Sequence, residues 1–399
     1  MDQDDHSHAG SYSSRKEHMV SQETGHDQRT PLLGHEESLD ILRQGLRNGH
    51  LAHAWIFHGP EGIGKRTVAI RLAELLLDPA TGPSHVDDFS ADQSSETVQL
   101  VHAGTHPDLH LIRKELAQDS IDPTLRSRKM TNIPIDLLRE RMLGGMVGSR
   151  TCDASVSRTP YLGHNKVFII DEAELLDEPG QAALLKTLEE PPDGTYIILV
   201  TTMEHRLLPT IRSRCQRLGF GPLDQEHMRA CLEHMAESVD GNDLDTVVRF
   251  AEGSPGMASI AIEAGIPGWI NVLEPMLQEL DSGGYPVELS NTLSELAGEY
   301  AETLAKKSRQ ASKEAANRRA CRLLISVLLQ RSRNMIRAAI DQEESMDRID
   351  LLMAVVELLS QADRRVGSNV QMKVLMADLV AQWASLVEQH SGHALESAS

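Results

Sequence analysis

The segment WIFHGPEGIGKRT (Trp55–Thr67) decides the fold of this chain. A short apolar run, Trp55–His58, predicts a buried strand that leads directly into a glycine-rich loop. From Thr67 to Leu77 apolar residues recur with a helical period, so the loop ends in a helix. A glycine-rich loop in this setting can close its backbone N–H groups around phosphate oxygens. The segment therefore predicts a phosphate-binding loop in an α/β domain.

The loop departs from the pattern G-x-x-x-x-G-K-[ST] at one position. Arg66 stands where a hydroxyl should hold Mg²⁺, and Thr67 comes one residue late, rotated about 100° around the helix. Two interpretations stay open: ATP with Mg²⁺ binds weakly, or the loop keeps its turn for packing and has lost catalysis. Residues that would contact a nucleotide are those of the loop itself: Gly59, Gly62, Gly64, Lys65, Arg66 and Thr67.

A second acidic motif, FIIDEAE (Phe168–Glu174), follows farther along the chain. It places Asp171 and Glu172 at the carboxyl end of a predicted strand. In a nucleotide hydrolase such an aspartate organises Mg²⁺ and such a glutamate orients the attacking water. Acids at strand ends also cap the next helix, which is the alternative interpretation. The motif gains weight only because it accompanies a phosphate loop.

Two more apolar runs, Leu109–Ile112 and Thr195–Thr202, have the length of strands, and Cys215–Phe220 is a plausible last strand. They alternate with segments of helical character such as Ile133–Met146 and Pro179–Glu190. Unbroken apolar strands alternating with helices are typical of a parallel sheet with helices on both faces. We assign this α/β domain to residues 31–222.

The rest of the chain differs in character. Residues 1–30 are polar and predict a disordered tail, and residues 79–100 lack periodicity and predict a loop or an insertion. After the α/β domain the strand signal ends. A small helical domain is expected over 223–280, and a longer all-helical one over 281–392.

Composition limits the function classes. The 399 residues carry 39 Lys and Arg against 59 Asp and Glu, a net charge of −20. Such an acidic chain lacks the basic surface that strong binding to nucleic acid alone requires. No apolar run reaches the ~18 residues of a membrane helix, and the N-terminus lacks the apolar stretch of a signal peptide. We expect a cytoplasmic protein that binds no membrane. Aromatic residues are only 3%, which predicts a core built mainly from aliphatic side chains.

The metal-binding residue types form no convincing site. The four cysteines (Cys152, Cys215, Cys231, Cys321) are far apart and have no metal-ligand spacing, so we expect reduced thiols. His102, His106 and His110 recur at the i, i+4 spacing of a helix. Pro107 interrupts that spacing and His110 lies in a predicted strand. The sequence therefore predicts no metal site, and in particular no zinc.

The segment QAALLKTLEEPPDGTYIILVTTMEHRLLPTIRSRCQRLGF (Gln181–Phe220) resembles the AAA+ core of bacterial clamp-loader subunits of DNA polymerase III. Other stretches resemble the same family: Leu51–Thr67, His106–Ile112, Gly253–Ala258 and Ala362–Val380. The resemblance implies an α/β AAA+ P-loop domain, a small helical lid domain and an all-α collar domain that assembles with other subunits. It implies a role in DNA replication.

In this family ATP lies at junctions between subunits, and the arginine of the Ser-Arg-Cys motif reaches the γ-phosphate of a neighbour. The resemblance implies that Arg214 is an arginine finger acting in trans and that Thr202 is the polar γ-phosphate sensor. The alternative is that Arg214 only pairs with a carboxylate of its own fold. The implied partners are gamma/tau and delta subunits, the sliding clamp, and primed DNA through the complex.

The family contains ATP-hydrolysing motor subunits and a stator with little or no ATPase activity. Arg66 and the motif LLPTIRSRC (Leu207–Cys215) favour the stator, as does Gly256, which stands where the motor carries a nucleotide-sensing arginine. Asp171 and Glu172 are retained, which keeps the motor alternative open. The DNA-directed DNA polymerase (nucleotidyltransferase) activity would belong to another subunit. A third hypothesis is an unrelated binding module with a degenerate phosphate loop.

Overall fold

The computed structural model describes residues 32–127, 131–162, 164–235, 241–307, 313–366 and 371–397. The predicted disordered tail, residues 1–30, lies outside these ranges. The contacts divide the chain into two units, Met1–Glu237 with Glu252–Met257, and Ser238–Ala251 with Ala258–Ser399. We describe each unit by itself. The predicted boundary between a lid domain and a collar domain at residue 280 stays a prediction.

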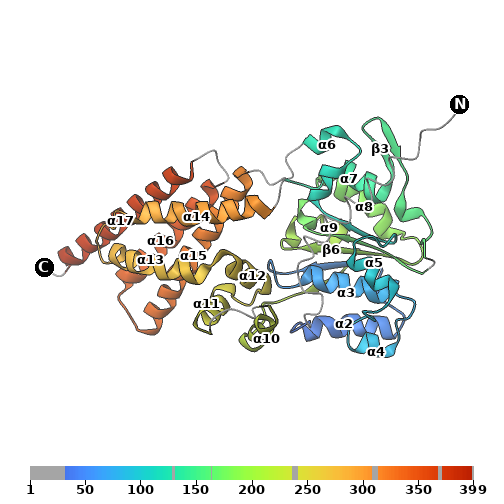
Figure 1. The fold of residues 1–399 in the computed structure, drawn as a ribbon, viewed down its shortest axis with the longest axis horizontal. Helices are drawn as coiled ribbons and strands as arrows, with labels where there is room; N and C mark the ends of the chain where they lie inside the picture. Colours follow the sequence, from blue (N-terminus) through green and yellow to red (C-terminus); the bar gives the residue numbers. More distant parts are fainter. Residues whose placement is uncertain are drawn as a thin grey trace. The chain divides into compact units, whose positions relative to one another are not determined.

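A five-stranded parallel sheet forms the centre of the first unit, as predicted (Figure 1). Along the sheet the order is β2-β5-β6-β1-β7, so the strand before the phosphate loop lies inside the sheet. The strands are β1 (Ala54–His58), β2 (Leu109–Ile112), β5 (Lys166–Ile170), β6 (Thr195–Thr201) and β7 (Gln216–Gly219).

Helices cover both faces of this sheet, because alternate side chains of each strand point to opposite sides. Phe57 packs with the helices on one face, and its neighbour Ile56 packs with those on the other. The first face carries α2 (Glu36–Arg47), α3 (Lys65–Leu77) and α5 (Glu96–His102). The second carries α7 (Ile135–Leu138), α8 (Glu178–Glu189) and α9 (Pro209–Arg212). The predicted α/β architecture is confirmed.

Two local predictions were wrong. The stretch 79–100 is not a structureless loop, because it contains α4 (Pro83–Asp87) and the start of α5, and Phe89 beside them is buried. Helices of five and seven residues are too short to show a helical period. The expected long helix after Ile133 is only α7 and a π-turn. Consecutive positive φ angles at Gly144 and Gly145 (74° and 114°) then lead into a hairpin.

That hairpin consists of β3 (Gly145–Val147) and β4 (Arg150–Cys152), and α6 (Pro123–Ser127) precedes α7. The first unit also includes α10 (Gln225–Met235).

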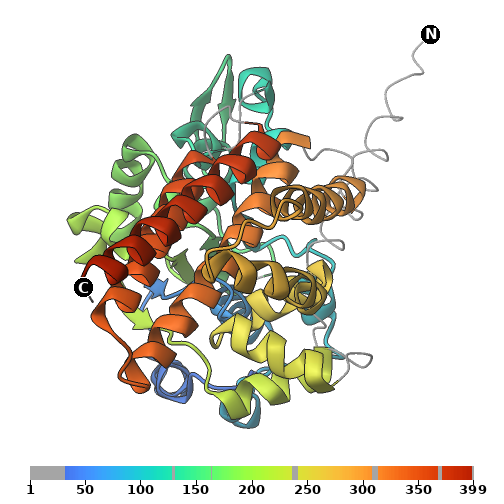
Figure 2. The same ribbon diagram turned by 90° about the vertical axis from the view of Figure 1, so that its left-hand side faces the viewer.

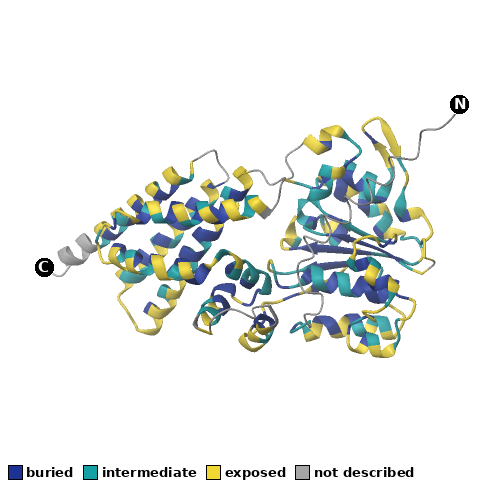
Figure 3. Cartoon of the chain, in the orientation of Figure 1, coloured by how far each residue is buried: buried dark blue, intermediate teal, exposed yellow. Residues whose placement is uncertain are grey.

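The phenylalanine side chains lie inside the fold. All five phenylalanines (Phe57, Phe89, Phe168, Phe220, Phe250) are buried. Figure 3 shows the same concentration of buried residues along the strands. The core is aliphatic by number, as predicted, but its largest side chains at the sheet are aromatic. Loss of one of them should therefore cost more stability than loss of a typical core residue.

The second unit is entirely helical over its described residues (Figure 2). Within it α14 packs against α15 and α17, and α16 packs against the same two helices, as in a four-helix bundle. Arg331 of α15 donates to Glu274 and Asp281 of α13, and the Trp383 indole of α17 also donates to Asp281. The bounds are α11 (Gly241–Ala251), α12 (Pro255–Ala264, whose first turn belongs to the first unit), α13 (Ile266–Asp281), α14 (Leu289–Lys307), α15 (Lys313–Asp341), α16 (Met346–Arg365) and α17 (Met372–Ser397).

Among the described residues, no single helix has the length and apolar character to cross a bilayer, and only the pair α12–α13, bent by 71°, passes such a test together.

His110 predicts a pH effect on stability. Its ring stacks on Phe168 with centroids 4.5 Å apart, and burial, helped by Lys166, lowers its pKa to about 4. Below pH 6.5 the unfolded chain binds a proton at this ring and the folded chain does not, until about pH 4. The titration of His110 therefore leaves the free energy of unfolding unchanged above pH 6.5 and lowers it as the pH falls from 6.5 to about 4.

The comparison of wild type with His110→Phe isolates this contribution, since other groups titrate in both. Between about pH 7 and about pH 5, wild type should lose more unfolding free energy than the variant, by up to about 1.4 kcal/mol per pH unit. Equal losses in urea titrations of the two proteins would contradict the assignment.

Candidate functional site

The glycine-rich loop between β1 and α3 has the conformation that its sequence predicts. Gly59, Gly62 and Gly64 all have positive φ angles, 144°, 74° and 97°. Glycine is needed at such angles, since other residues are strained there. A side chain at Gly59 or Gly62 would also collide with neighbours, whereas nothing lies within 4 Å of the Cβ position of Gly64. The loop is therefore packed on one side and open beside Gly64.

Lys65 begins α3 and is almost fully buried, with 5% of its surface exposed. Its ammonium donates to the carbonyl oxygens of Gly59 (2.7 Å) and Pro60 (2.5 Å). Burial lowers its pKa, against the opposing effect of the carboxylates of Glu174 and Asp171. The Lys65 ammonium thus binds carbonyl oxygens of its own loop, where it would otherwise meet a phosphate.

Arg66 points its guanidinium at the acidic motif. Its Nη1 atom lies 3.4 Å from Oδ2 of Asp171, the residue that follows β5. Such a distance makes an ion pair and a weak hydrogen bond rather than a tight one. The aspartate that the sequence predicts as an organiser of Mg²⁺ therefore faces a positive side chain of the same chain. Thr67 follows in the first turn of α3.

Glu172, the predicted water-orienting acid, is paired as well. It has a left-handed backbone, with φ of 53°, which is strained for a residue other than glycine. Its carboxylate accepts a hydrogen bond from the Lys114 ammonium at 2.6 Å. Burial raises the pKa of Glu172, and the nearby Lys114 opposes that rise. The pairing follows from strand register. Ile112 of β2 is opposite Ile170 of β5, and Lys114 and Glu172 each lie two residues after these partners.

Thr202, the predicted γ-phosphate sensor, bonds to a third acid. Its hydroxyl donates to Oε1 of Glu174 at 2.5 Å, and its backbone N–H donates to the same atom at 3.1 Å. Burial alone would raise the pKa of Glu174, but the hydrogen bonds from Thr202 and Thr201 hold it below its usual range. The sensor position therefore lies beside the acidic motif, directly after the neighbouring strand β6.

A distant loop closes over the phosphate loop within the same unit. The Gly256 N–H donates to the carbonyl of Gly62 at 2.8 Å, and the Ser254 hydroxyl donates to that of Glu61 at 3.0 Å. A Cβ at Gly256 would lie 2.7 Å from the Gly62 Cα. The contact exists because both positions are glycine. No side chain can start at residue 256 without moving this loop.

Arg214, the predicted arginine finger, follows α9 at the edge of the sheet. Its guanidinium pairs with Glu189 at the end of α8 and donates to the Thr210 carbonyl at 3.0 Å. The side chain is 35% exposed. In the single chain the arginine thus pairs with a carboxylate of its own fold, as the alternative interpretation expects. Its role toward a neighbouring subunit is not tested by this contact.

Some residues of the site carried little sequence signal. Lys114 and Glu189 stand outside the motifs, and only strand register could have predicted the first. Glu174 belongs to the acidic motif but was given no role. His35 is a further addition, since its Nε2 atom lies 2.8 Å from the carbonyl of Ile63 in the phosphate loop.

The three spaced histidines do not share a helix. His102 bonds to the buried Glu74 at 2.9 Å, His106 lies in a loop, and His110 is in β2. Within the described ranges, no group of three His, Cys, Asp or Glu side chains is arranged to hold a metal ion. The absence of a zinc site stays a prediction.

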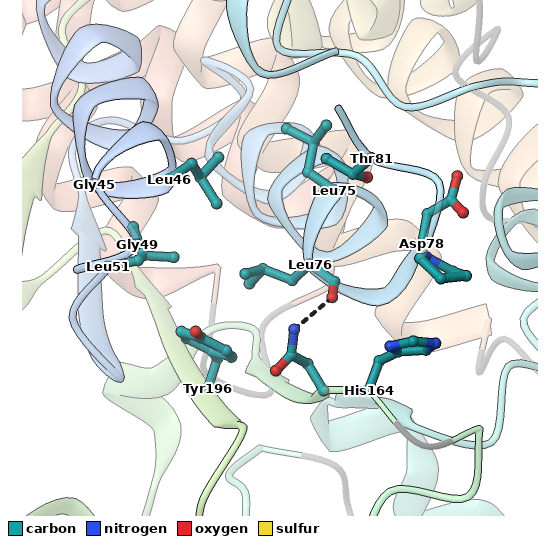
Figure 4. A pocket seen from close by; sticks show the side chains of 12 residues that line it. Gly45, Leu46, Gly49, Leu51, Leu75, Leu76, Asp78, Thr81, His164 and Tyr196 are labelled. Atoms are coloured by element: carbon teal, nitrogen blue, oxygen red, sulfur yellow. Dashed lines mark hydrogen bonds between the residues drawn. The ribbon is translucent and has the colours of Figure 1, made fainter. Parts of the chain in front are cut away.

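A hollow of about 280 Å³ lies at the opposite end of α3 (Figure 4). It is lined by residues at the amino end of β6 and the carboxyl end of α3, among them Tyr196 and Leu76. Asn165 also lines the hollow, and its amide donates to the Leu76 carbonyl at 2.7 Å. With α3 rising about 1.5 Å per residue, this hollow is separate from the phosphate loop. The charged groups gather at the loop.

Comparisons with known proteins find similarity to subunits of DNA polymerase III. Residues 34–224 match the sequence model of a family described as "DNA polymerase III, delta subunit". The chain is 32% identical over 227 residues to DNA polymerase III subunit tau of Escherichia coli, covering 56% of this chain and 30% of that protein. It is 35% identical over 207 residues to DNA polymerase III subunit delta' of Pseudomonas aeruginosa, covering 51% and 54%.

Among solved structures, a gamma subunit-related protein of DNA polymerase III from Thermotoga maritima aligns with 88% of this chain and 99% of its own, at 20% identity and a TM-score of 0.42. The chain spans about a third to a half of the length of the two curated relatives named above. The residues matched by the family model, 34–224, include the phosphate loop and the acidic motif.

Proposed function

The chain belongs to the clamp-loader family of DNA polymerase III through residues 34–224, and on that premise we propose that it is the delta prime type of subunit, the stator of the loader. In this role it joins a ring of AAA+ subunits and completes the ATP site of a neighbouring motor subunit. It helps to load the sliding clamp on primed DNA during replication. It performs no polymerase chemistry and little or no ATP hydrolysis of its own.

One observation carries this proposal: each acid of the predicted hydrolytic motif is held by another side chain of the same protein. Asp171 faces Arg66, and Glu172 is bonded to Lys114. A hydrolytic site needs the first acid for Mg²⁺ and the second for the attacking water. With both acids paired, Mg²⁺ and the attacking water would each have to compete with a cationic side chain of the same chain. The glycine contact at Gly256 supports the same conclusion, since no sensing side chain can arise there.

Under this proposal the chain contributes to ATP hydrolysis through Arg214, which acts on the ATP of a neighbouring subunit. An exposed ion pair such as Arg214–Glu189 contributes only about 0–1 kcal/mol, so a neighbour's phosphate can replace it at small cost. A guanidinium is planar and always charged, and it suits the charge that builds on a transferred phosphoryl group. We infer that Arg214 turns from Glu189 to the γ-phosphate of the adjacent motor subunit when the ring assembles.

The partners of this proposal are gamma/tau-type and delta-type subunits, with the sliding clamp and DNA reached through the assembly. A net charge of −20 fits a chain that takes its DNA contact from partners.

A second candidate is the ATP-hydrolysing motor subunit. It is favoured by the similarity to the tau subunit at 32% identity and by the retention of Asp171 and Glu172. Such a motor would have to release Asp171 from Arg66 and Glu172 from Lys114 before it could bind metal and water. The two candidates therefore differ in whether this chain turns over ATP alone.

Reconstitution tests the proposal. The gamma/tau and delta subunits of the source organism are mixed with or without this chain, and clamp loading on primed DNA is measured. We expect a stoichiometric complex by sedimentation and clamp loading that depends on the chain. Motor subunits that load clamps equally fast without it, or a chain that stays monomeric in the mixture, would rule out the stator.

A further inference from the structure

The phosphate loop of this chain lacks the ligands with which such loops hold the Mg²⁺ of a nucleotide. Mg²⁺ in such a site takes a hydroxyl from the first turn of the helix and a water-mediated or direct contact to the strand-end aspartate. It demands nearly octahedral oxygen ligands at about 2.0–2.1 Å. Residue 66 offers no oxygen here and instead directs a cation at Asp171, 3.4 Å away. The residues present do not fit the metal.

The other acids of the motif already accept hydrogen bonds from side chains of the same protein. Glu172 accepts from Lys114 at 2.6 Å, and Glu174 accepts from the Thr202 hydroxyl at 2.5 Å. A divalent cation at these carboxylates would approach a guanidinium and an ammonium of the same sign. The local charge is already balanced by the protein.

The loop nevertheless keeps the features that recognise phosphate. Three glycines have positive φ angles, and α3, a helix of 13 residues, begins at Lys65, so the first N–H groups of a helix lie at the end of the loop. The side of the loop beside Gly64 is open. Lys65 and Arg66 place two cations at consecutive positions of the first turn. Metal ions serve phosphate sites by neutralising polyphosphate charge, and a guanidinium can do the same through paired N–H donors.

We propose that this loop binds the polyphosphate of a nucleotide without a divalent cation, with the Arg66 guanidinium standing where the metal would stand. This inference rests on the proposed function, under which the loop belongs to a chain that does not hydrolyse ATP. The ligand would be metal-free ATP or ADP. In the bound state Arg66 bridges Asp171 and a phosphate oxygen, and Lys65 leaves the Gly59 and Pro60 carbonyls for the phosphate.

The test is ATP binding by the isolated full chain, measured calorimetrically in excess EDTA and again in excess MgCl₂. We expect a Kd in EDTA no higher than that in Mg²⁺. Arg66→Ala should raise the Kd in EDTA about ten-fold or more, because it removes a charge-assisted contact. Arg66→Thr supplies a hydroxyl and frees Asp171, so it should reverse the preference and make binding depend on Mg²⁺.

Arg47→Ala is the matched control, since it removes one exposed positive charge elsewhere in the same unit, where Arg47 pairs with Asp87. It should bind ATP like wild type. Circular dichroism checks that each variant is folded. Binding by wild type only in Mg²⁺, or no binding in either buffer by folded protein, would overturn the inference.

These failures are distinguishable from a failure of the proposed function. A chain that binds no ATP but still supports clamp loading through Arg214 refutes only the metal-free site. A chain that binds and turns over MgATP refutes both.

Discussion

Replacing Arg214 with alanine is expected to lower ATP turnover about 10³-fold at the one junction that this chain completes. The guanidinium is the only group that the proposed function places on a neighbour's γ-phosphate. Removing it leaves the neighbour's own phosphate loop intact and takes away only charge stabilisation in the transition state. Nucleotide affinity should therefore change much less than the rate.

The measurement needs a complex in which this junction can be read alone. Motor subunits that lack their own phosphate-loop lysine are placed at the other junctions, and single-turnover hydrolysis is followed. Arg214→Lys should also be strongly impaired, because an ammonium cannot reproduce the paired donors of the guanidinium. The matched control is Arg217→Ala. Arg217 lies three residues after Arg214, is exposed, and is paired with Glu204.

A purely structural role for Arg214 predicts a different outcome. Loss of its ion pair with Glu189 would then reduce stability by about 0–1 kcal/mol and leave turnover unchanged. Wild-type turnover in an assembled Arg214→Ala complex would show that the arginine is not a finger.

Phe168→Ala is expected to lower the unfolding free energy of the first unit by about 3–5 kcal/mol. Phe168 lies in β5, between β2 and β6, and its side chain is fully buried. One face of its ring stacks on His110 at 4.5 Å. The cavity left in the central sheet explains the size of the effect.

Two variants control this prediction. Phe168→Leu keeps most of the volume and should cost less than about 1.5 kcal/mol. Ile41→Ala changes a residue that is 43% exposed on α2 and should stay within about 0.5 kcal/mol of wild type. Hydrogen exchange of the β5 and β6 amides reports the first unit separately. If Phe168→Ala exchanged like Ile41→Ala, the placement of Phe168 in the core would be wrong.

The sheet could be predicted because most of its strands are short apolar runs. Trp55–His58 and Leu109–Ile112 are four residues long, and both form strands at or within one residue of the predicted bounds. The stretch 79–100 could not be predicted, because α4 is too short to carry a period. The hairpin after α7 was missed because two consecutive glycines with positive φ end the helical pattern there, and their conformation depends on tertiary packing.

The candidate site shows the same division. The motifs located Lys65, Asp171 and Thr202, and the structure brings the loop and the acidic motif together, with Arg66 on Asp171. Their hydrogen-bond partners were not predicted, since ion pairs such as Arg214–Glu189 join segments with no shared pattern. The contact between Gly62 and Gly256 joins residues far apart in the sequence, and only the folded chain reveals that both must be glycine.

The central claim is that this chain does not work as a motor, and ATP hydrolysis by the purified full chain tests it most directly. The account predicts no turnover above the level of the Lys65→Ala and Glu172→Gln variants, because Asp171 and Glu172 are held by Arg66 and Lys114. Turnover of about 1 s⁻¹ that both substitutions abolish would contradict it and would identify the chain as an ATP-hydrolysing subunit.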